Sequence, residues 1–218
     1  DHSLIAGSSG TVMDFAGREV LIPENLDDGI ITVGRLSTLR WLAYFPDAME
    51  NVIMYDKGIK DALGTSGAAY TYAYKKELED LPIHTNESMI DSEDMYKLKP
   101  SLILVNSDVY GNHKNRCDIL ARFFPLVVVD EMADLSQVGF WDSEFNLSQR
   151  FVDQADLYGK ILKMEERGKE VKDIFQKHLD NIRGMVTPND FTAYIAGPMY
   201  KGSHILNETF PEYIALNL

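Results

Sequence analysis

The segment from residue 11 to residue 34, TVMDFAGREVLIPENLDDGIITVG, predicts a small β-hairpin that leads directly into a buried strand. A tight turn at Ala16-Gly17 fits the hairpin, because glycine adopts the positive φ that a short connection needs. Pro23 then ends the second strand of the hairpin. The run IITV at residues 30–33 is apolar or β-branched throughout, which is typical of a parallel strand covered on both faces. A hairpin joined to such a strand favours an α/β fold.

Further apolar runs alternate with segments of helical periodicity along the chain. We predict strands at residues 30–33, 51–55, 102–106 and 126–130, and helices at residues 37–45 and 93–98. Lys99-Pro100 must end the second of these helices, since the residue before a proline is pushed out of the α region. Strands that alternate with helices indicate βαβ units and a mostly parallel, Rossmann-like sheet.

Residues 147–186 contain no proline and are rich in Glu, Lys, Gln and Leu, which are strong helix formers. Two helices fit this segment, at residues 147–162 and 165–182. The second helix is expected to present one apolar face, formed by Val171, Ile174, Phe175, His178, Leu179 and Ile182. The sequence FTAYIAG, within residues 190–197, then predicts a new strand.

Composition limits the classes of protein that fit. The 218 residues carry a formal net charge of -13, which argues against nucleic-acid binding because that needs clustered Lys and Arg. The single cysteine, Cys117, cannot form an intramolecular disulfide, and no apolar run approaches the roughly 20 residues of a membrane span. Residues 1–10, DHSLIAGSSG, have the composition of a linker left after a cleaved signal or lipid anchor, although the remnant of an expression tag looks the same.

Four segments carry a family resemblance, and they occur in the expected order. They are D-x-x-G-R-x-V-x-I-P at residues 14–23, LKPSLILV at 98–105, PLVVVDE at 125–131 and YGKILKMEERGKEV at 158–171. Together they resemble periplasmic (solute-)binding proteins of ABC importers, in the iron-siderophore, haem and cobalamin class. Ser101 departs from the pattern, because the family usually has aspartate there. The resemblance implies two α/β lobes joined by one long helix.

The resemblance divides the chain into four parts. Residues 1–10 would be a linker or tail, 11–146 the N-terminal α/β lobe, 147–186 helices that include the inter-lobe backbone helix, and 187–218 the start of an incomplete C-terminal lobe. A single strand and a loop cannot bury a core of their own, since ordering each residue costs roughly 1 to 2 kcal/mol. The last part is therefore expected to fold back onto the first lobe, to pair with a second copy of the chain, or to remain unpacked.

The loops after the strands are the expected binding site, because ligands of open α/β sheets bind beyond the carboxyl ends of the strands. Tyrosines there would give rigid contact surfaces, and cations would neutralise an anionic ligand. The candidate ligand-binding residues are Arg35, Ser37, Lys57, Tyr72, Tyr110, Asp130, Tyr200 and Lys201.

Other interpretations of these aromatic and cationic residues stay open. The alternation of Tyr70, Tyr72 and Tyr74 equally fits one face of a half-buried strand. Arg40 beside Trp41 favours a surface salt bridge or a stacking pair, which makes Arg35 the better ligand candidate.

Glu93 lies five residues before the Leu98-Lys99-Pro100 sequence. The resemblance implies that this glutamate docks onto arginines of a membrane permease. An ordinary solvated helix carboxylate is the alternative.

The function implied by the resemblance is capture without catalysis. The protein would be the substrate-binding component of an ABC transporter that takes an iron chelate (siderophore or haem) or a cobalamin-like ligand in an inter-lobe cleft and delivers it to the permease. It would lie in the periplasm, or on the outer face of the cytoplasmic membrane as a lipoprotein, and it could self-associate through its incomplete second lobe.

No intrinsic cofactor, metal site or enzyme activity is expected. The sequence lacks the common nucleotide-binding and hydrolase motifs. The five histidines do not show close metal-ligand spacing; they are His2, His84, His113, His178 and His204. Two alternatives remain, an oxyanion (molybdate or tungstate) binding protein of the same class and an α/β sensing or interaction domain without transport. A reductase of similar architecture would need cluster-ligating cysteines, which one cysteine does not supply.

Overall fold

The structure is a computed structural model that describes residues 10–64, 69–84, 92–130 and 146–185. The chain divides into two compact units. The first unit comprises Asp1–Glu131 and Asp153–Lys169, and the second comprises Met132–Val152 and Glu170–Leu218. The boundaries between the units cross two helices, at residues 152–153 and 169–170.

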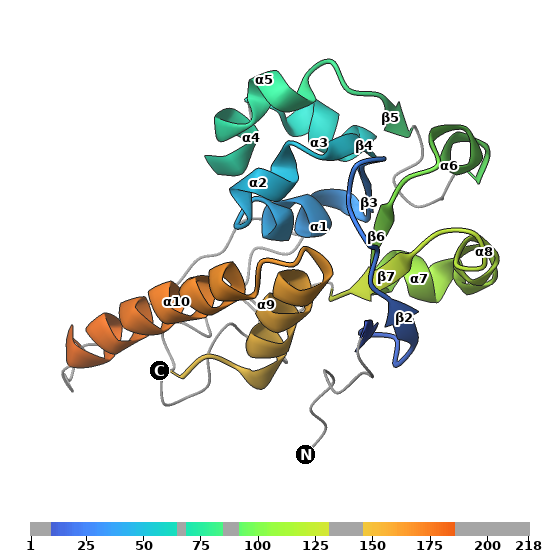
Figure 1. The fold of residues 1–218 in the computed structure, drawn as a ribbon. Helices are drawn as coiled ribbons and strands as arrows, with labels where there is room; N and C mark the ends of the chain where they lie inside the picture. The colour runs from blue at the N-terminus through green and yellow to red at the C-terminus, as the bar shows by residue number, and fades with distance from the viewer. Residues whose placement is uncertain (1–9, 65–68, 85–91, 131–145, 186–218) are drawn as a thin grey trace, which may run out of the picture. The chain divides into compact units, whose positions relative to one another are not determined.

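A five-stranded sheet forms the centre of the first unit, with strand order β5-β4-β3-β6-β7 and every pairing parallel (Figure 1). Its strands are β3 (Ile30–Val33), β4 (Val52–Asp56), β5 (Ile83–His84), β6 (Leu102–Asn106) and β7 (Leu126–Val129). The four predicted strands are confirmed, with ends that shift by at most one residue. The short strand β5 escapes prediction because two residues carry no periodicity.

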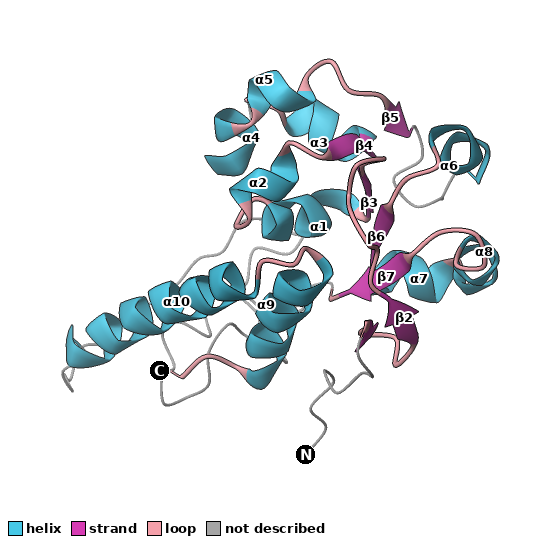
Figure 2. Cartoon of the chain, in the orientation of Figure 1, coloured by secondary structure: helices cyan, strands magenta, loops and turns pink. Residues whose placement is uncertain are grey.

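Helices connect the strands, as expected for βαβ units (Figure 2). They are α1 (Arg35–Leu42), α2 (Pro46–Met49), α3 (Lys57–Ala62), α4 (Ala69–Ala73), α5 (Lys75–Leu78), α6 (Ser92–Leu98), α7 (Ser107–Asn112), α8 (Lys114–Leu120), α9 (Gln149–Ile161) and α10 (Glu165–Met185). Among these described helices, none combines the length and apolar character needed to cross a membrane.

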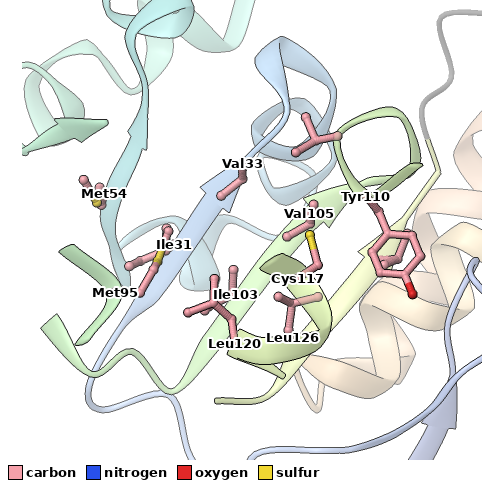
Figure 3. Close-up of a cluster of buried hydrophobic side chains, with 12 residues drawn as sticks. Ile31, Val33, Met54, Met95, Ile103, Val105, Tyr110, Cys117, Leu120 and Leu126 are labelled. Carbon is pink, nitrogen blue, oxygen red and sulfur yellow. The ribbon is translucent and has the colours of Figure 1, made fainter. Parts of the chain in front are cut away.

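One face of the sheet is covered by α6, α7 and α8 (Figure 3). Alternate residues of the strands, such as Ile31, Ile103 and Leu126, point to this face and meet Met95 of α6 and Leu120 of α8. All of these side chains are almost fully buried, and burying a large aliphatic side chain stabilises a fold by roughly 1.5 to 3 kcal/mol. Cys117 of α8 lies in the same cluster, and burial raises the pKa of its thiol to about 11.

Aromatic residues of α1 and α9 form a second core cluster in the first unit. The ring of Tyr158 stacks between Trp41 and Phe45, at centroid distances of 5.7 Å and 5.9 Å. The Tyr158 hydroxyl donates a 3.1 Å hydrogen bond to the carbonyl oxygen of Thr38, and burial raises the pKa of this phenol. Residues 153–161 of α9 therefore pack on α1.

The predicted hairpin is confirmed, with β1 (Thr11–Met13) antiparallel to β2 (Glu19–Leu21). Asp14 is fully buried at its turn and accepts hydrogen bonds from the backbone N–H groups of Ala16, Arg18 and Val128 at 2.9 to 3.1 Å. The Arg18 guanidinium binds the same carboxylate at 3.0 Å and 2.6 Å and donates to the Leu126 carbonyl. The D-x-x-G-R motif thus fastens the hairpin to β7.

One predicted helix and one strand alternative require correction. Helix α1 begins two residues earlier than predicted and ends at Leu42, because the chain breaks before Pro46, which is the first residue of α2. The strand alternative for Tyr70, Tyr72 and Tyr74 is wrong, since Tyr70 and Tyr72 belong to helix α4 and Tyr74 follows it directly. Alanines at both ends of α4 favour this helix over a strand.

The described part of the second unit is residues 146–152 and 170–185. Gln176 accepts a 3.0 Å hydrogen bond from the Leu147 N–H, and the rings of Phe151 and Phe175 lie 5.0 Å apart. The apolar face predicted for the second helix is too wide. Val171 and Leu179 are buried, whereas Ile174, His178 and Ile182 are exposed, so the buried stripe follows only the i, i+4, i+8 positions. The strand predicted within residues 190–197 lies outside the described residues.

Candidate functional site at the carboxyl edge of the sheet

The sheet changes direction between β3 and β6. From β3 the chain adds β4 and β5 on one side, and from β6 it adds β7 on the other. In open α/β sheets the crevice at such a switch point, beyond the carboxyl ends of the strands, is where ligands bind. The residues that follow β3 and β6 therefore lie at this switch point.

Gly34 follows β3 and is held by side chains from both neighbouring strands. Its N–H donates a 3.0 Å hydrogen bond to Asp56 Oδ2, and its carbonyl accepts a 2.9 Å bond from Asn106 Nδ2. Its φ of 121° is one that side chains disfavour, and an added Cβ would lie 2.2 Å from Asn106 Cγ. Only glycine fits here.

Asn106 also begins the next helix. Its Oδ1 accepts a 2.8 Å hydrogen bond from the Val109 N–H, which makes it the N-cap of α7. One buried amide thus joins the exits of β3 and β6, and Asp56 extends the connection to β4. We call Gly34, Asp56, His84 and Asn106 the edge network.

His84 completes the edge network from β5. Its Nε2 lies 3.3 Å from Asp56 Oδ1 and 3.3 Å from the Thr32 carbonyl oxygen. Both neighbours are acceptors, so Nε2 is the ring nitrogen that carries the proton. Because the side chains of His84 and Asp56 are fully buried, they hold the carboxyl edge of the sheet in place from the interior of the first unit.

Asp130 follows β7 and is also fixed by a side chain. Gln154 of α9 accepts from its N–H at 2.9 Å and donates to its carbonyl at 3.3 Å. Asp130 is only 2% exposed, so this candidate ligand residue belongs to the support of the edge.

The other sequence-predicted ligand residues reach different environments. Arg35 and Ser37 lie in the first turn of α1 at the switch point, and their side chains are outside the described part of the structure. Lys57 begins α3 beside β4 and pairs with Asp61 one turn later. Tyr72 projects from α4 with 58% of its surface exposed.

Tyr110 faces the hairpin rather than the open edge. The Arg18 guanidinium lies 4.7 Å from its ring centroid, and its hydroxyl donates a 3.0 Å hydrogen bond to Asp118. Its described contacts are therefore those of a core residue. Tyr200 and Lys201 lie outside the described residues.

Glu93 is an exposed carboxylate in the first turn of α6, and it pairs with Lys97 at 2.8 Å. Helix α6 leads into the amino end of β6, so its first turn lies toward the carboxyl ends of the strands. The side chain is thus accessible on the same side of the first unit as the edge network.

Sequence reasoning did not identify the edge network as a unit. A signal was available, since LILVN and VIMYD are apolar runs that each close on a polar residue. Within the described ranges, the structure forms no group of three or more His, Cys, Asp or Glu side chains that could hold a metal ion.

Comparison with known proteins gave matches only among solved structures. No protein-family model and no curated protein sequence matches this chain. The TroA-like periplasmic binding protein FepB from Veillonella parvula has a TM-score of 0.55 at 17% identity, over 79% of this chain and 48% of FepB. The siderophore-binding protein BauB, solved with two acinetobactin molecules and ferric iron, has a TM-score of 0.52 at 18% identity, over 80% of this chain and 53% of BauB.

A third similar structure is the molybdate periplasmic binding protein MolA from Haemophilus influenzae, with a TM-score of 0.53 at 18% identity, over 75% of this chain and 49% of MolA. The chain thus spans about half the length of the solved structures that it matches. The α/β class and parallel sheet expected from the sequence are confirmed. This chain has the fold of the periplasmic binding proteins over about half of their length.

Proposed function

We propose that this chain is part of the substrate-binding component of an ABC importer and that it captures an anionic metal chelate, foremost a ferric siderophore. The edge network carries the proposal, because it pre-organises the switch point of a lobe that shares the periplasmic binding protein fold. A rigid site loses little conformational entropy when a ligand binds. BauB, a protein of this fold, is a siderophore-binding protein.

Cationic residues beside this site suit such a ligand. Arg35 begins α1 at the switch point and Lys57 begins α3 beside it, so both are placed to neutralise an anion. The Gln154 side chain holds the backbone of Asp130 at the end of β7. Tyr200 and Lys201 would contribute from the other side of the ligand. Catalysis has no part in this proposal.

Delivery to a permease would use Glu93. An exposed carboxylate on the side of the switch point can pair with arginines of a membrane partner while the ligand is held. The protein would then act in the periplasm, or as a lipoprotein on the outer face of the cytoplasmic membrane.

Molybdate or tungstate is the second candidate ligand, since MolA shares the fold and binds molybdate. The same cations, Arg35 and Lys57, would serve a small oxyanion.

Thermal unfolding with ferric siderophores, haem, cobalamin, molybdate and tungstate tests the proposal. A ligand that binds only the folded chain raises the midpoint, and we expect a shift of several degrees with one compound. Lys57→Gln should reduce this shift, whereas Lys76→Gln, on exposed α5, should leave it unchanged. A folded chain whose midpoint responds to none of the five compounds would contradict the proposal.

A further inference from the structure

A pocket of about 540 Å³ opens between α1 and α4 in the first unit. Its walls are the aromatic rings of Tyr44, Tyr70 and Tyr74, and Arg40 is the one charged residue among its described lining residues. Ala43, Ala69 and Ala73 complete the lining, and their small side chains leave the space between the rings open. The volume lies in the range of sites for small organic molecules.

The pocket is separate from the edge network. Helix α1 leaves the carboxyl edge at Arg35, and a helix rises 1.5 Å per residue, so Arg40 lies roughly 8 Å further along, and Tyr44 follows the far end of the helix. The charge of Asp47, in the helix that precedes β4, acts on Tyr74 at the rim. The pocket therefore lies toward the amino ends of the strands, away from the proposed chelate site.

Arg40 supplies positive charge without a carboxylate partner in the described part of the chain. It is half-buried, and neither the salt bridge nor the stacking pair expected from the sequence forms among the described residues. Its charge acts on the phenols of Tyr44 and Tyr70. Arg40 lies in the last turn of α1, where a cation also offsets the helix dipole, but that role does not require tyrosines around it.

The tyrosines are neutral at physiological pH. Burial raises the pKa of the Tyr70 phenol to about 12 and also raises the pKa of Tyr44 and Tyr74. Their hydroxyls can donate hydrogen bonds, and their faces can stack on a flat ring. Among the described residues, the carboxylates that act on these phenols are Asp47 and Glu77, which raise the pKa of Tyr74, whereas Arg167 lowers it.

We propose that the pocket formed by Arg40, Tyr44, Tyr70 and Tyr74 binds a small planar aromatic carboxylic acid. The ring would lie between the tyrosine faces over the alanines, and the carboxylate would pair with the Arg40 guanidinium. This site is independent of the proposed function, and it needs no residue of the edge network.

Isothermal titration calorimetry with 1-naphthoate tests this inference on the full chain. We expect saturable binding with a Kd below about 1 mM, which is a modest affinity for so few contacts. Cyclohexanecarboxylate has the charge without the flat ring, and 1-naphthalenemethanol has the ring without the charge; each should bind at least tenfold more weakly. Equal binding of all three compounds would overturn the proposal.

Two substitutions locate the site. Ala73→Leu fills the pocket from an exposed helix position and should abolish binding, and Arg40→Gln should raise the Kd at least tenfold. Ala121→Leu and Arg122→Gln are matched controls on the exposed end of α8, in a second groove of about 450 Å³ beside Phe123. If the control pair loses binding and the first pair keeps it, the inference is wrong.

An NMR measurement on the unsubstituted chain gives a test that does not depend on whether a variant folds. The edge of the Trp41 ring contacts Tyr44 at a centroid distance of 5.5 Å, so naphthoate in the pocket should shift the indole N–H resonance of Trp41. Binding without that shift would place the acid elsewhere. A diamagnetic gallium(III) complex of the siderophore, bound at the edge network, should leave this resonance unchanged, which separates the outcome from that of the proposed function.

Discussion

The Asp14–Arg18 pair fastens the hairpin to β7, and we call it the hairpin anchor. Both the hairpin anchor and the edge network connect separate strands, but they do so with different chemistry. In both, one buried side chain binds backbone groups of separate strands: Asp14 at the hairpin and Asn106 at the edge. The hairpin uses an ion pair surrounded by donors, whereas the edge uses a neutral amide and a close-packed glycine. The anchor is mostly local in sequence, since Asp14 and Arg18 are four residues apart, while Gly34 and Asn106 are separated by 72. A local device can be recognised in a sequence, and a distant one becomes visible only in the fold.

The largest expected effect comes from removing the anchor. Asp14→Ala would leave the Arg18 guanidinium without its buried partner and three backbone N–H groups without an acceptor. We expect the free energy of unfolding to fall by about 3 to 5 kcal/mol. Urea denaturation measures this, with exposed Asp27→Ala as the control. A loss similar to that of the control would show that the hairpin is held by other contacts.

The two glycines give a matched comparison between the regions. Gly34→Ala forces a Cβ to within 2.2 Å of Asn106 Cγ and should cost about 2 to 4 kcal/mol. Gly17→Ala, in the hairpin turn at φ 71°, meets no atom within 4 Å and should cost only about 1 to 2 kcal/mol.

The double variant Gly34→Ala/Asn106→Ala tests the contact between the two residues. Removing the Asn106 amide relieves the two shortest contacts, at 2.2 Å and 2.5 Å, and leaves the Asn106 Cβ at 2.7 Å, so the combined loss measured by denaturation should be smaller than the sum of the two single losses. Additive losses would mean that the two residues are not in contact.

Cys117 is buried on the face of the sheet that is covered by α6, α7 and α8, so its titration tests the stability of that region. Because burial raises the pKa of Cys117 to about 11, above the value of about 8.5 in an unfolded chain, the protonated thiol stabilises the fold at neutral pH, and this contribution is lost as pH rises from about 9 to 11. Between pH 8 and pH 10 the loss should be about 2 kcal/mol beyond that of Cys117→Ala. Parallel pH profiles of the two proteins would refute this.

The smallest effect should come from the exposed pair on α6, which belongs to neither region. Glu93→Gln should change the free energy of unfolding by less than about 0.5 kcal/mol, because its pair with Lys97 is solvated. If denaturation finds a larger loss, Glu93 has a structural role, and a docking role would no longer be needed to explain its exposed position.

The sequence predicted the elements whose signals are local. The hairpin, the four longer strands and the two last helices follow from turn chemistry, apolar runs and helix formers within a few residues. The helices α2, α3, α4, α5, α7 and α8 were not predicted, because at four to seven residues they span too few turns for a period to show. Strand order could not be predicted either, since it depends on pairings between distant segments.

The candidate site was predicted less completely than the fold. The strand-end loops stay the predicted place of the site, and the pairing of Asp56 with the Gly34 N–H and of His84 with Asp56 depends on the order β5-β4-β3. The position of Tyr110 after β6 suggested that it lines a ligand site. In the structure its ring packs beneath the Arg18 guanidinium. Whether a residue after a strand faces outward depends on the helix that follows.

The strand order also sets the timing of folding during synthesis. The central strand β3 pairs with β4 soon after it is made, but its other neighbour, β6, follows only about seventy residues later. Until then an apolar strand edge has no partner on the growing chain, and such edges promote aggregation. During synthesis, β6 is therefore the strand whose emergence can cover this open edge of β3.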